Sequence, residues 1–449
     1  MPNSVIINNK IKSFKKKIYV SSDKSLSIRC ILLASQAIGT SKISNLLESE
    51  DVTNTLKAIK KLGIDYSKHK NTYKIYGFGL NGFNTKKKLT INAGNSGTLG
   101  RLLIGLCVKS ENKIKLVGDK SLSRRDFSRV TDPIKIFGAE INSKNNGLPL
   151  QIKGTEFLRP IDYFEKKGSA QCKSAVMLAA LNTPGITKIK AKKSRNHTEI
   201  LFKYLNLPIK VKSKTNFDEI EIKGLKQFKS FNYVIPGDIS SSAFFIVLTL
   251  LSKNSILFIK KVNINKSRLG IVKILNKMNA KIKFYNKKKY NGEDVADIYV
   301  KSITNIKSIN CPPDLNSAAI DEFLVIFLVA ARAKGISTFK KLNELNKKES
   351  PRLDISIKFL KMIGIKVLRN KDNIKIYGNP NLNLNGNYYV KNFLKDHRVF
   401  MMSCIAALTF GGNWKIYDKE SVNTSFPKFL KVLKSLGAKI IWKKKKLLQ

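Results

Sequence analysis

The chain has 449 residues and 43% of them are apolar, which is enough to bury large cores in two or more domains. Five widely spaced cysteines without a CxxC pair argue against a disulfide-stabilised module and against a zinc site. A net charge of +53 would suggest a polyanionic partner, but only 12 of the 84 basic residues are Arg, and the lysines occur in every segment. The longest apolar runs, such as Ala243 to Leu251, are far short of the roughly 20 residues of a membrane helix. We therefore expect a cytoplasmic protein that binds neither nucleic acid nor membrane.

In chain order, the first expected elements are a short strand over Lys16 to Val20 and a helix that starts at DKSLSIR, near Lys24. The next amphipathic helix, KAIKKL, ends at Gly63, and five later segments repeat this pattern of an amphipathic helix, a Gly or Asn, and strand-like residues. Gly and Asn tolerate the left-handed conformation that ends many helices. The six positions are Gly63, Gly138, Asn206, Asn279, Gly364 and Gly437, spaced by 75, 68, 73, 85 and 73 residues.

The stretch Ile91 to Val108, INAGNSGTLGRLLIGLCV, predicts a strand, a glycine-rich turn and a buried helix. Asn95, Ser96 and Thr98 are residue types found at helix N-caps, and Gly97 would let a ligand approach the helix end that favours anions. Alone this signal is weak, because it is neither a Walker A loop nor a dinucleotide fingerprint. Five other apolar helices also begin with small or charged residues: SSDKSLSIRCILLA, GSAQCKSAVMLAAL, GDISSSAFFIVL, AAIDEFLVIFLVAA and KDHRVFMMSCIAAL.

Two independent series with one period indicate six copies of a unit of about 75 residues, each with two helices and several strands. Pro236 and Gly237 mark the crossing between two halves of three units. If the strand Lys16 to Val20 completes the second half, the chain crosses twice, near Ser22 and near Asp238, which favours a hinge. We expect a first domain over 22–237 and a second domain made of 1–21 and 238–449.

In the first half, candidate anion-binding residues lie at the starts of the apolar helices. Lys24, Ser25 and Arg29 precede ILLASQA, and a solvated surface pair is the alternative reading of the two cations. GDKSLSRRDF supplies Arg124 and Arg125, which would otherwise be part of a charged loop. Arg side chains favour bidentate binding of carboxylate and phosphate. Ser169 and Gln171 are neutral donors that would orient a hydroxylated ring or a phosphate.

In the second half, Asp321 and Glu322 stand at the head of FLVIFLVAA, where a carboxylate is either functional or a partner of the helix dipole. KKESPRLD contains Lys348, Glu349 and Arg352, and Lys to Arg at i, i+4 would place two cations on one helical face. Only an anion between them would make this pairing favourable. DHR adds Arg398 before MMSCIAAL. The histidines show no metal-ligand spacing.

Taken together, these motifs resemble the EPSP synthase family over nearly the whole chain, from DKSLSIR to TSFPKF. The corresponding segments are DKSLSIR, GNSGT, SLSRRDF, GSAQCKSA, SRNHTE, GDISSSAFF, IDEF, KKESPRL and DHR. SAQ with Lys173, IDE and TSFP are closer to the second class of the family. The resemblance implies two inside-out α/β barrel domains, each of three βαβαββ units, which agrees with the sixfold period.

The resemblance also implies transfer of the enolpyruvyl group of phosphoenolpyruvate to the 5-hydroxyl of shikimate 3-phosphate, without cofactor or metal, by a monomer. Asp321 and Glu349 would handle protons, with Lys24 as a third catalytic group. The residues expected to bind the two substrates are Lys24, Ser25, Arg29, Asn95, Gly97, Arg125, Ser169, Ala170, Gln171, Ser194, Asp321, Lys348, Arg352 and Arg398.

The sequence departs from the family pattern at Asp126, where Pro is usual, at Ala170, where the commoner class has Ser, and at Thr424, where that class has Lys. Ser350 and Pro351 favour a helix that starts there. These departures affect individual phosphate contacts rather than the reaction.

Two alternatives are a UDP-N-acetylglucosamine enolpyruvyl transferase and a basic nucleic-acid-binding repeat protein. The first family has a Lys-Asn pair at the first helix and a reactive Cys in the loop before its Arg. This chain instead has Lys24-Ser25 and no Cys between Gly118 and Arg125. Basic stretches rich in aromatic residues would favour the second alternative, but the aromatic residues of this chain are scattered.

Overall fold

The computed structural model describes residues 4–80, 82–84 and 88–442, and the chain divides into two units. The first unit comprises Ser22–Pro236 and Lys289–Glu293. The second unit comprises Met1–Ser21, Gly237–Lys288 and Asp294–Gln449. The chain therefore passes between the units at Ser21/Ser22 and at Pro236/Gly237, and it passes twice more around Lys289–Glu293.

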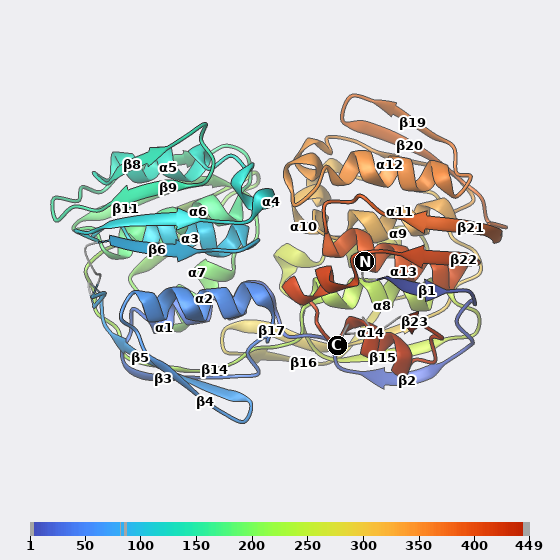
Figure 1. Ribbon diagram of the computed structural model, residues 1–449, viewed down its shortest axis with the longest axis horizontal. Coiled ribbons are helices and arrows are strands. Elements are labelled where there is room, and N and C mark those ends of the chain that lie inside the picture. The colour runs from blue at the N-terminus through green and yellow to red at the C-terminus, as the bar shows by residue number, and fades with distance from the viewer. Residues whose placement is uncertain (1–3, 81, 85–87, 443–449) are drawn as a thin grey trace, which may run out of the picture. The chain divides into compact units, whose positions relative to one another are not determined.

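The first unit contains three four-stranded sheets with one common plan (Figure 1). Their strand orders are β6-β7-β9-β8, β10-β11-β13-β12 and β14-β3-β5-β4, and in each sheet the first two strands are parallel while the others pair antiparallel. Two of the sheets each come from one continuous βαβαββ repeat, and in the third sheet the first strand, β14, comes from the end of the unit. The strands are β3 (Ile38–Ser44), β4 (Tyr66–His69), β5 (Thr72–Phe78), β6 (Lys88–Asn92), β7 (Lys113–Val117), β8 (Glu140–Ser143), β9 (Leu150–Lys153), β10 (Asp162–Glu165), β11 (Ile186–Lys192), β12 (Ile209–Ser213), β13 (Phe217–Lys223) and β14 (Asn232–Val234).

The second unit repeats this plan with the orders β16-β17-β15-β2, β18-β20-β19 and β21-β22-β1-β23. In the three-stranded sheet the first strand is reduced to the parallel bridges Lys307–Lys334 and Asn310–Thr338. The N-terminal segment supplies one strand to each of two sheets, because β2 pairs parallel with β15 and β1 lies between β22 and β23. The strands are β1 (Val5–Ile7), β2 (Lys15–Ile18), β15 (Ile256–Asn263), β16 (Lys283–Tyr290), β17 (Glu293–Lys301), β18 (Gly335–Phe339), β19 (Val367–Asn370), β20 (Asn373–Gly378), β21 (Leu384–Val390), β22 (Gly411–Ile416) and β23 (Ile441–Trp442).

Six apolar helices form the interior of the two units. A helix that is apolar on every side is stable in water only when it is buried all round, and every residue of α8, α11 and α13 is buried. The predicted burial of these helices is confirmed. They are α1 (Lys24–Ala34), α3 (Gly97–Leu106) and α6 (Ala170–Leu181) in the first unit, and α8 (Ile239–Leu251), α11 (Phe323–Ala331) and α13 (His397–Phe410) in the second.

The amphipathic helices of the other series cover these cores and end where the sequence predicted. The residue after each helix C-cap has a positive φ: Gly63 (+87°), Gly138 (+116°), Asn206 (+53°), Asn279 (+78°), Gly364 (+79°) and Gly437 (+100°). The sixfold repeat is therefore confirmed. The helices are α2 (Glu50–Lys61), α5 (Ser128–Ile136), α7 (His197–Tyr204), α9 (Gly270–Lys277), α12 (Arg352–Met362) and α14 (Phe429–Ser435). The short helices are α4 (Lys120–Ser123), α10 (Asn316–Ala319), η1 (Lys266–Arg268), η2 (Pro313–Leu315), η3 (Asn343–Lys347) and η4 (Lys419–Thr424).

Close packing of α3 against α6 depends on Gly105. A Cβ at Gly105 would lie 2.0 Å from the carbonyl oxygen of Ala175, whereas a Cβ at Gly100 would make ordinary contacts, at 3.4 Å from the Phe127 ring and 3.8 Å from the Ala93 Cβ. Both substitutions by Ala gain about 1 kcal/mol of helix propensity. We expect Gly105→Ala to destabilise the protein by about 2 kcal/mol or more through overpacking, and Gly100→Ala to leave stability unchanged or higher. Urea unfolding of the two variants checks this, and equal stabilities would contradict the packing argument.

All five cysteines are free and buried. Burial raises the pKa of the Cys107 thiol to about 12, so this side chain packs as a small neutral group. None of the helices in the described part of the chain is both long and apolar enough to cross a bilayer.

Candidate active site

The N-terminal end of α1, which we call the mouth of the helix, contains the first cluster of predicted site residues. Asp23 caps the helix by accepting a hydrogen bond from the Leu26 amide at 3.0 Å. Lys24 follows and forms an ion pair with Asp51, with Nζ and Oδ2 2.7 Å apart. Asp51 lies in the first turn of α2 and was not selected from the sequence.

Arg29 lies one turn further along α1 and is buried. Its Nε donates to Thr198 Oγ1 at 2.8 Å, its Nη2 to Ser174 Oγ at 3.1 Å, and its Nη1 to the Ser25 carbonyl at 3.1 Å. Thr198 is the second residue of α7 and Ser174 lies on α6, so the guanidinium links three helices. Neither hydroxyl residue was predicted, because their partner is remote in sequence.

The mouths of α3 and α6 are joined through Gln171. Its Nε2 donates to Thr98 Oγ1 and its Oε1 accepts from Arg101 Nη1, both at 2.9 Å. Beside them, Asn95 donates to Asp119 at 2.6 Å and accepts from Arg125 Nη2 at 3.5 Å. The structure thus brings the predicted residues Asn95, Gln171 and Arg125 to one end of the α3–α6 pair.

Three other predicted residues of this unit lie near the start of α6 or just before α7. Ser169 is the N-cap of α6 and its Oγ accepts from the Cys172 amide at 3.3 Å, while Ala170 is the first helical residue. Ser194 precedes α7, and within the described residues its buried Oγ has no hydrogen-bond partner. Ser169 therefore has a structural role already, whereas the Ser194 hydroxyl is available to a ligand.

Gly97 is the first residue of α3, and a Cβ there would lie 2.8 Å from both Arg101 Nη1 and Arg125 Nη1. An added methyl would displace two flexible cations rather than backbone. We expect Gly97→Ala to raise the KM for phosphoenolpyruvate more than that for shikimate 3-phosphate, because the resemblance places Gly97 and Arg125 at the donor. Steady-state kinetics with each substrate varied checks this. Equal effects would mean that Gly97 serves only the turn.

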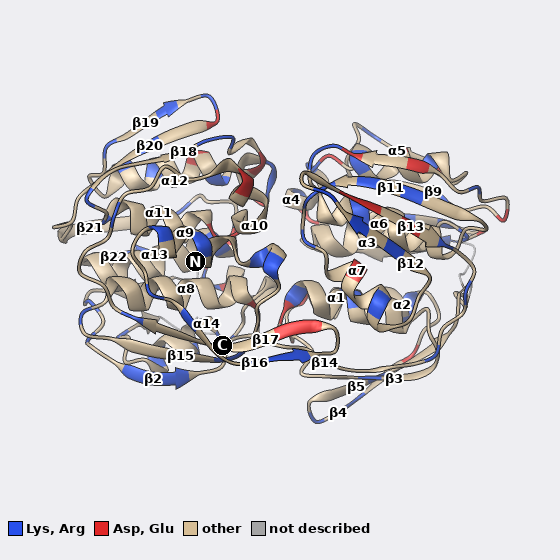
Figure 2. Ribbon diagram, turned by 180° about the vertical axis from the view of Figure 1, so that it is seen from behind, with Lys and Arg blue, Asp and Glu red and all other residues tan. Residues whose placement is uncertain are grey.

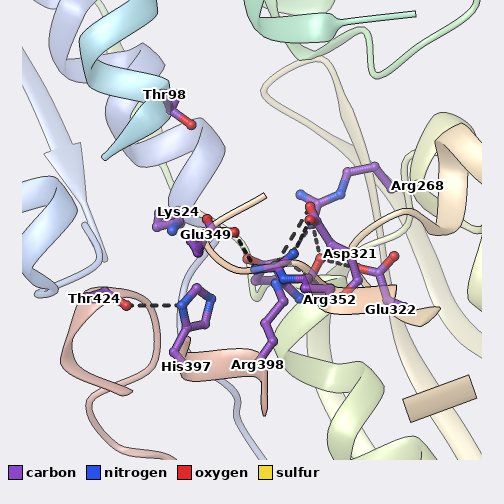
Figure 3. Close-up of polar contacts among 12 residues, drawn as sticks. Lys24, Thr98, Arg268, Asp321, Glu322, Glu349, Arg352, His397, Arg398 and Thr424 are labelled. Atoms are coloured by element: carbon purple, nitrogen blue, oxygen red, sulfur yellow. Dashed lines mark hydrogen bonds and ion pairs between the residues drawn. The ribbon is translucent and has the colours of Figure 1, made fainter. Parts of the chain in front are cut away.

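The second unit contains a cluster of carboxylates around Arg352, whose side chain is fully buried. Its Nη1 lies 3.2 Å from Asp321 Oδ1, its Nε lies 2.9 Å from Asp396 Oδ2, and its Nη2 donates to Glu349. Figure 3 shows the side chains of Asp321, Glu349 and Arg352 directed toward one another. The predicted residues Asp321, Glu349 and Arg352 are thus brought together.

The expectation that Lys348 and Arg352 share one helical face is wrong. α12 begins at Arg352, and Lys348 has an extended backbone at the end of η3. Pro351 is the N-cap of α12 and ends the preceding extended segment, because the residue before a proline is disfavoured in the α region. The repulsion between Lys348 and Arg352 at helical spacing therefore does not arise, and Arg352 is balanced by carboxylates of the chain itself.

The charges in this cluster stabilise one another. Burial is the largest single influence on the pKa of Asp396 and would raise it, but the charge and hydrogen bond of Arg352, together with His397, hold the pKa below its usual value. Burial would likewise lower the pKa of Arg352, and Asp396, Glu349 and Asp321 together raise it. Arg352 is therefore a permanent cation that holds Asp321 through Nη1 and Glu349 through Nη2.

Arg398, at the start of α13, makes further contacts with Asp321. Its Nη1 donates to the Asp321 carbonyl at 2.9 Å, and its Nη2 lies 3.8 Å from Asp321 Oδ2. Asp396 caps α13 by accepting from the Arg398 amide at 2.9 Å. The mouths of α11 and α13 are thereby connected through Asp321.

Two of the departures from the family pattern have local partners. Asp126 accepts hydrogen bonds from the amide and hydroxyl of Ser128, at 2.8 and 2.6 Å, at the start of α5. Thr424 Oγ1 lies 3.2 Å from His397 Nδ1. Asp126 therefore organises the turn before α5, and Thr424 contacts the first residue of α13. Over the described residues, no three His, Cys, Asp or Glu side chains gather in a way that would hold a metal ion.

Comparison with known proteins relates the chain as a whole to one group of enzymes. Residues 8–433 match the family described as EPSP synthase (3-phosphoshikimate 1-carboxyvinyltransferase). A 3-phosphoshikimate 1-carboxyvinyltransferase from Ruthia magnifica subsp. Calyptogena magnifica is 39% identical over 427 residues, which cover 94% of this chain and 95% of that protein. Another, from Zymomonas mobilis subsp. mobilis, is 35% identical over 438 residues and 96% of each chain. A solved EPSP synthase from Acinetobacter baumannii has a TM-score of 0.85 and 32% identity, covering 98% of this chain and 100% of that one.

Proposed function

Because the chain belongs to the EPSP synthase (3-phosphoshikimate 1-carboxyvinyltransferase) family, we propose that it transfers the enolpyruvyl group of phosphoenolpyruvate to the 5-hydroxyl of shikimate 3-phosphate. The products are 5-enolpyruvylshikimate 3-phosphate and inorganic phosphate, on the route to chorismate and the aromatic amino acids. The observation that carries the proposal is the pairing of Asp321 and Glu349 on the buried guanidinium of Arg352. Proton transfer in both directions needs two carboxylates held beside cations.

The acceptor is proposed to bind at the mouths of α1, α6 and α7. Shikimate 3-phosphate is a carboxylate and a phosphate monoester, so its recognition needs cations and hydroxyl donors together. Lys24, Ser25 and Arg29 would bind its charged groups, with Ser169, Ala170, Gln171 and Ser194 at the ring and phosphate. The unpartnered Ser194 hydroxyl supports this assignment, because a buried donor without a partner is costly unless a ligand satisfies it.

The donor is proposed to contact Asn95, Gly97 and Arg125 in the first unit and Lys348, Arg352 and Arg398 in the second. In the first step the 5-hydroxyl loses its proton as its oxygen bonds to C2 of phosphoenolpyruvate, while the C3 methylene gains a proton. The resulting ketal phosphate then loses a methyl proton and expels phosphate. Asp321, Glu349 and Lys24 are the proposed groups for these transfers, since Asp321 and Glu349 are carboxylates at helix mouths and Lys24 is a cation already paired with Asp51.

Phosphate release in a coupled assay tests the reaction directly. We expect release only when phosphoenolpyruvate and shikimate 3-phosphate are both present, and none with UDP-N-acetylglucosamine as acceptor. Addition of a metal chelator should leave the rate unchanged. Duplex DNA at about physiological salt should also leave it unchanged, because binding through exposed lysines is weak and screened there. Figure 2 shows Lys and Arg on strands, loops and helices of both units rather than on one element, which supports a solvated charge instead of a nucleic-acid surface.

We also propose that the chain forms two domains, 22–237 and 1–21 with 238–449, joined in a cytoplasmic monomer by a hinge at the two crossings near Ser22 and near Asp238. The residues proposed to bind the two substrates are divided between the two units, so catalysis requires that these residues be brought together. We expect the radius of gyration from small-angle X-ray scattering to fall on addition of shikimate 3-phosphate, with a scattering mass that stays at 50.5 kDa. An unchanged radius at saturating acceptor would contradict closure, and a doubled mass would contradict the monomer.

A further inference from the structure

We propose that Glu293, at the tip of the β16–β17 hairpin, is a positioning residue for the acceptor site. Its carboxylate fixes His197 and thereby the first turn of α7, which in turn holds Arg29. This inference rests on the proposed function, because it is there that Arg29 is assigned to shikimate 3-phosphate. Glu293 itself is not expected to contact either substrate.

The hairpin tip fits closely against α7. β16 and β17 belong to a sheet of the second unit, but the tip residues Lys289–Glu293 group with the first unit. Asn291 Nδ2 donates to the Tyr204 hydroxyl at 2.7 Å. Gly292 has a φ of +83°, and a Cβ there would lie 3.1 Å from the side chain of Ile200 and 3.2 Å from that of Tyr204. The hairpin tip therefore packs at a defined position on α7, which we call its seat.

Glu293 and His197 form the buried contact at this seat. Glu293 Oε1 and His197 Nδ1 are 2.6 Å apart, and each side chain is 1% exposed. His197 is the first residue of α7, and the N-cap residue Asn196 makes no side-chain capping hydrogen bond. Tertiary contacts of the first turn must then set where this helix begins.

The next two residues of the same turn lead into the acceptor site. Thr198 Oγ1 accepts from Arg29 Nε at 2.8 Å and lies 2.7 Å from Ser174 Oγ. Glu199 forms a buried ion pair with Lys173 on α6, with Oε1 and Nζ 2.5 Å apart. Three consecutive residues thus tie α7 to the hairpin tip, to Arg29 and to α6. A shift of His197 displaces Thr198 directly, and with it the hydroxyl that orients the Arg29 guanidinium.

Glu293→Gln tests the proposal, because the amide keeps the size of the side chain and removes its charge. We expect the KM and the calorimetric Kd for shikimate 3-phosphate to rise about three- to ten-fold, which is the range for weakening one charged hydrogen bond. The KM for phosphoenolpyruvate should stay within about two-fold. Asp294→Asn is the matched control, since Asp294 is the next residue of the same strand and is exposed. It should change neither constant.

Coupling to Arg29 separates positioning from a general loss of structure. In an Arg29→Lys background the contact with Thr198 Oγ1 is already lost, so Glu293→Gln should add less than about two-fold to the acceptor Kd. A full additional effect in that background, or equal changes for both substrates, would overturn the proposal. His197→Gln carries the same prediction from the other side of the contact if Glu293→Gln fails to fold. Wild-type protein that releases no phosphate would instead refute the proposed function.

Discussion

Asp321→Asn is expected to reduce turnover by about two to four orders of magnitude, the usual contribution of one general base. The amide keeps the shape of the side chain but cannot accept a proton. Arg352 and Arg398 both contact Asp321, and their positive charges stabilise the carboxylate that the reaction requires. Binding of shikimate 3-phosphate should stay within a few-fold, because the proposed acceptor cations lie in the first unit. Steady-state phosphate release and calorimetric acceptor binding of the same folded variant measure the two effects.

Asp314→Asn is a suitable control for this prediction. Asp314 lies in η2, shortly before Asp321 in the chain, and is exposed, so it should leave turnover unchanged. Near-normal turnover in Asp321→Asn would remove Asp321 from the chemistry. Glu349, on the other side of Arg352, would then be the better candidate for the base.

The sixfold repeat could be predicted because its signals are local. A Gly or Asn after an amphipathic helix predicts a residue in the left-handed conformation without any knowledge of tertiary contacts. All six positions have a positive φ. The apolar helix starts are equally local. In contrast, β1 was not foreseen, because its pairing between β22 and β23 depends on segments more than 400 residues away, such as Ile416 opposite Val5.

Only those residues of the candidate site that lie in recognisable motifs could be predicted from the sequence. Lys24, Arg29, Asp321 and Arg352 lie in recognisable segments, and each is at or near a helix mouth. Their partners Thr198, Ser174 and Asp396 lie in such segments too, and Asp51 does not, but none of the four was selected because their contacts are made by the tertiary fold. The start of α12 at Arg352 agrees with the prediction from Ser350 and Pro351, but the spacing argument for Lys348 and Arg352 failed, since i, i+4 positions share a face only inside one helix. Sequence therefore indicates which residues matter more readily than what they touch.

Arg352→Met is expected to lower the free energy of unfolding by about 3–5 kcal/mol at neutral pH, because it leaves buried carboxylates without their cation. Asp396 is the most affected, since its side chain is fully buried and bonds Arg352 through both oxygens. Arg369→Met is the control: Arg369 pairs with Asp354 at the surface, where both side chains are about 40% exposed, and its loss should cost less than about 1 kcal/mol. Urea titrations of the three proteins give the comparison, and equal losses in the two variants would contradict a buried cluster.

The pH dependence of Arg352→Met should have the opposite sign to that of the wild type. In the wild type, Arg352 holds the pKa of Asp396 below its ordinary value. The pair therefore contributes its full stability above the pKa of the unfolded chain, about 3.9, and loses it only as pH falls through the lower folded pKa. In the variant, burial and the neighbouring Glu349 both raise the pKa, so the ionised carboxylate destabilises the fold at neutral pH and protonation relieves this. The difference in unfolding free energy between variant and wild type should shrink from pH 7 to pH 5. A difference that is constant over this interval would mean that Asp396 is not the group left uncompensated.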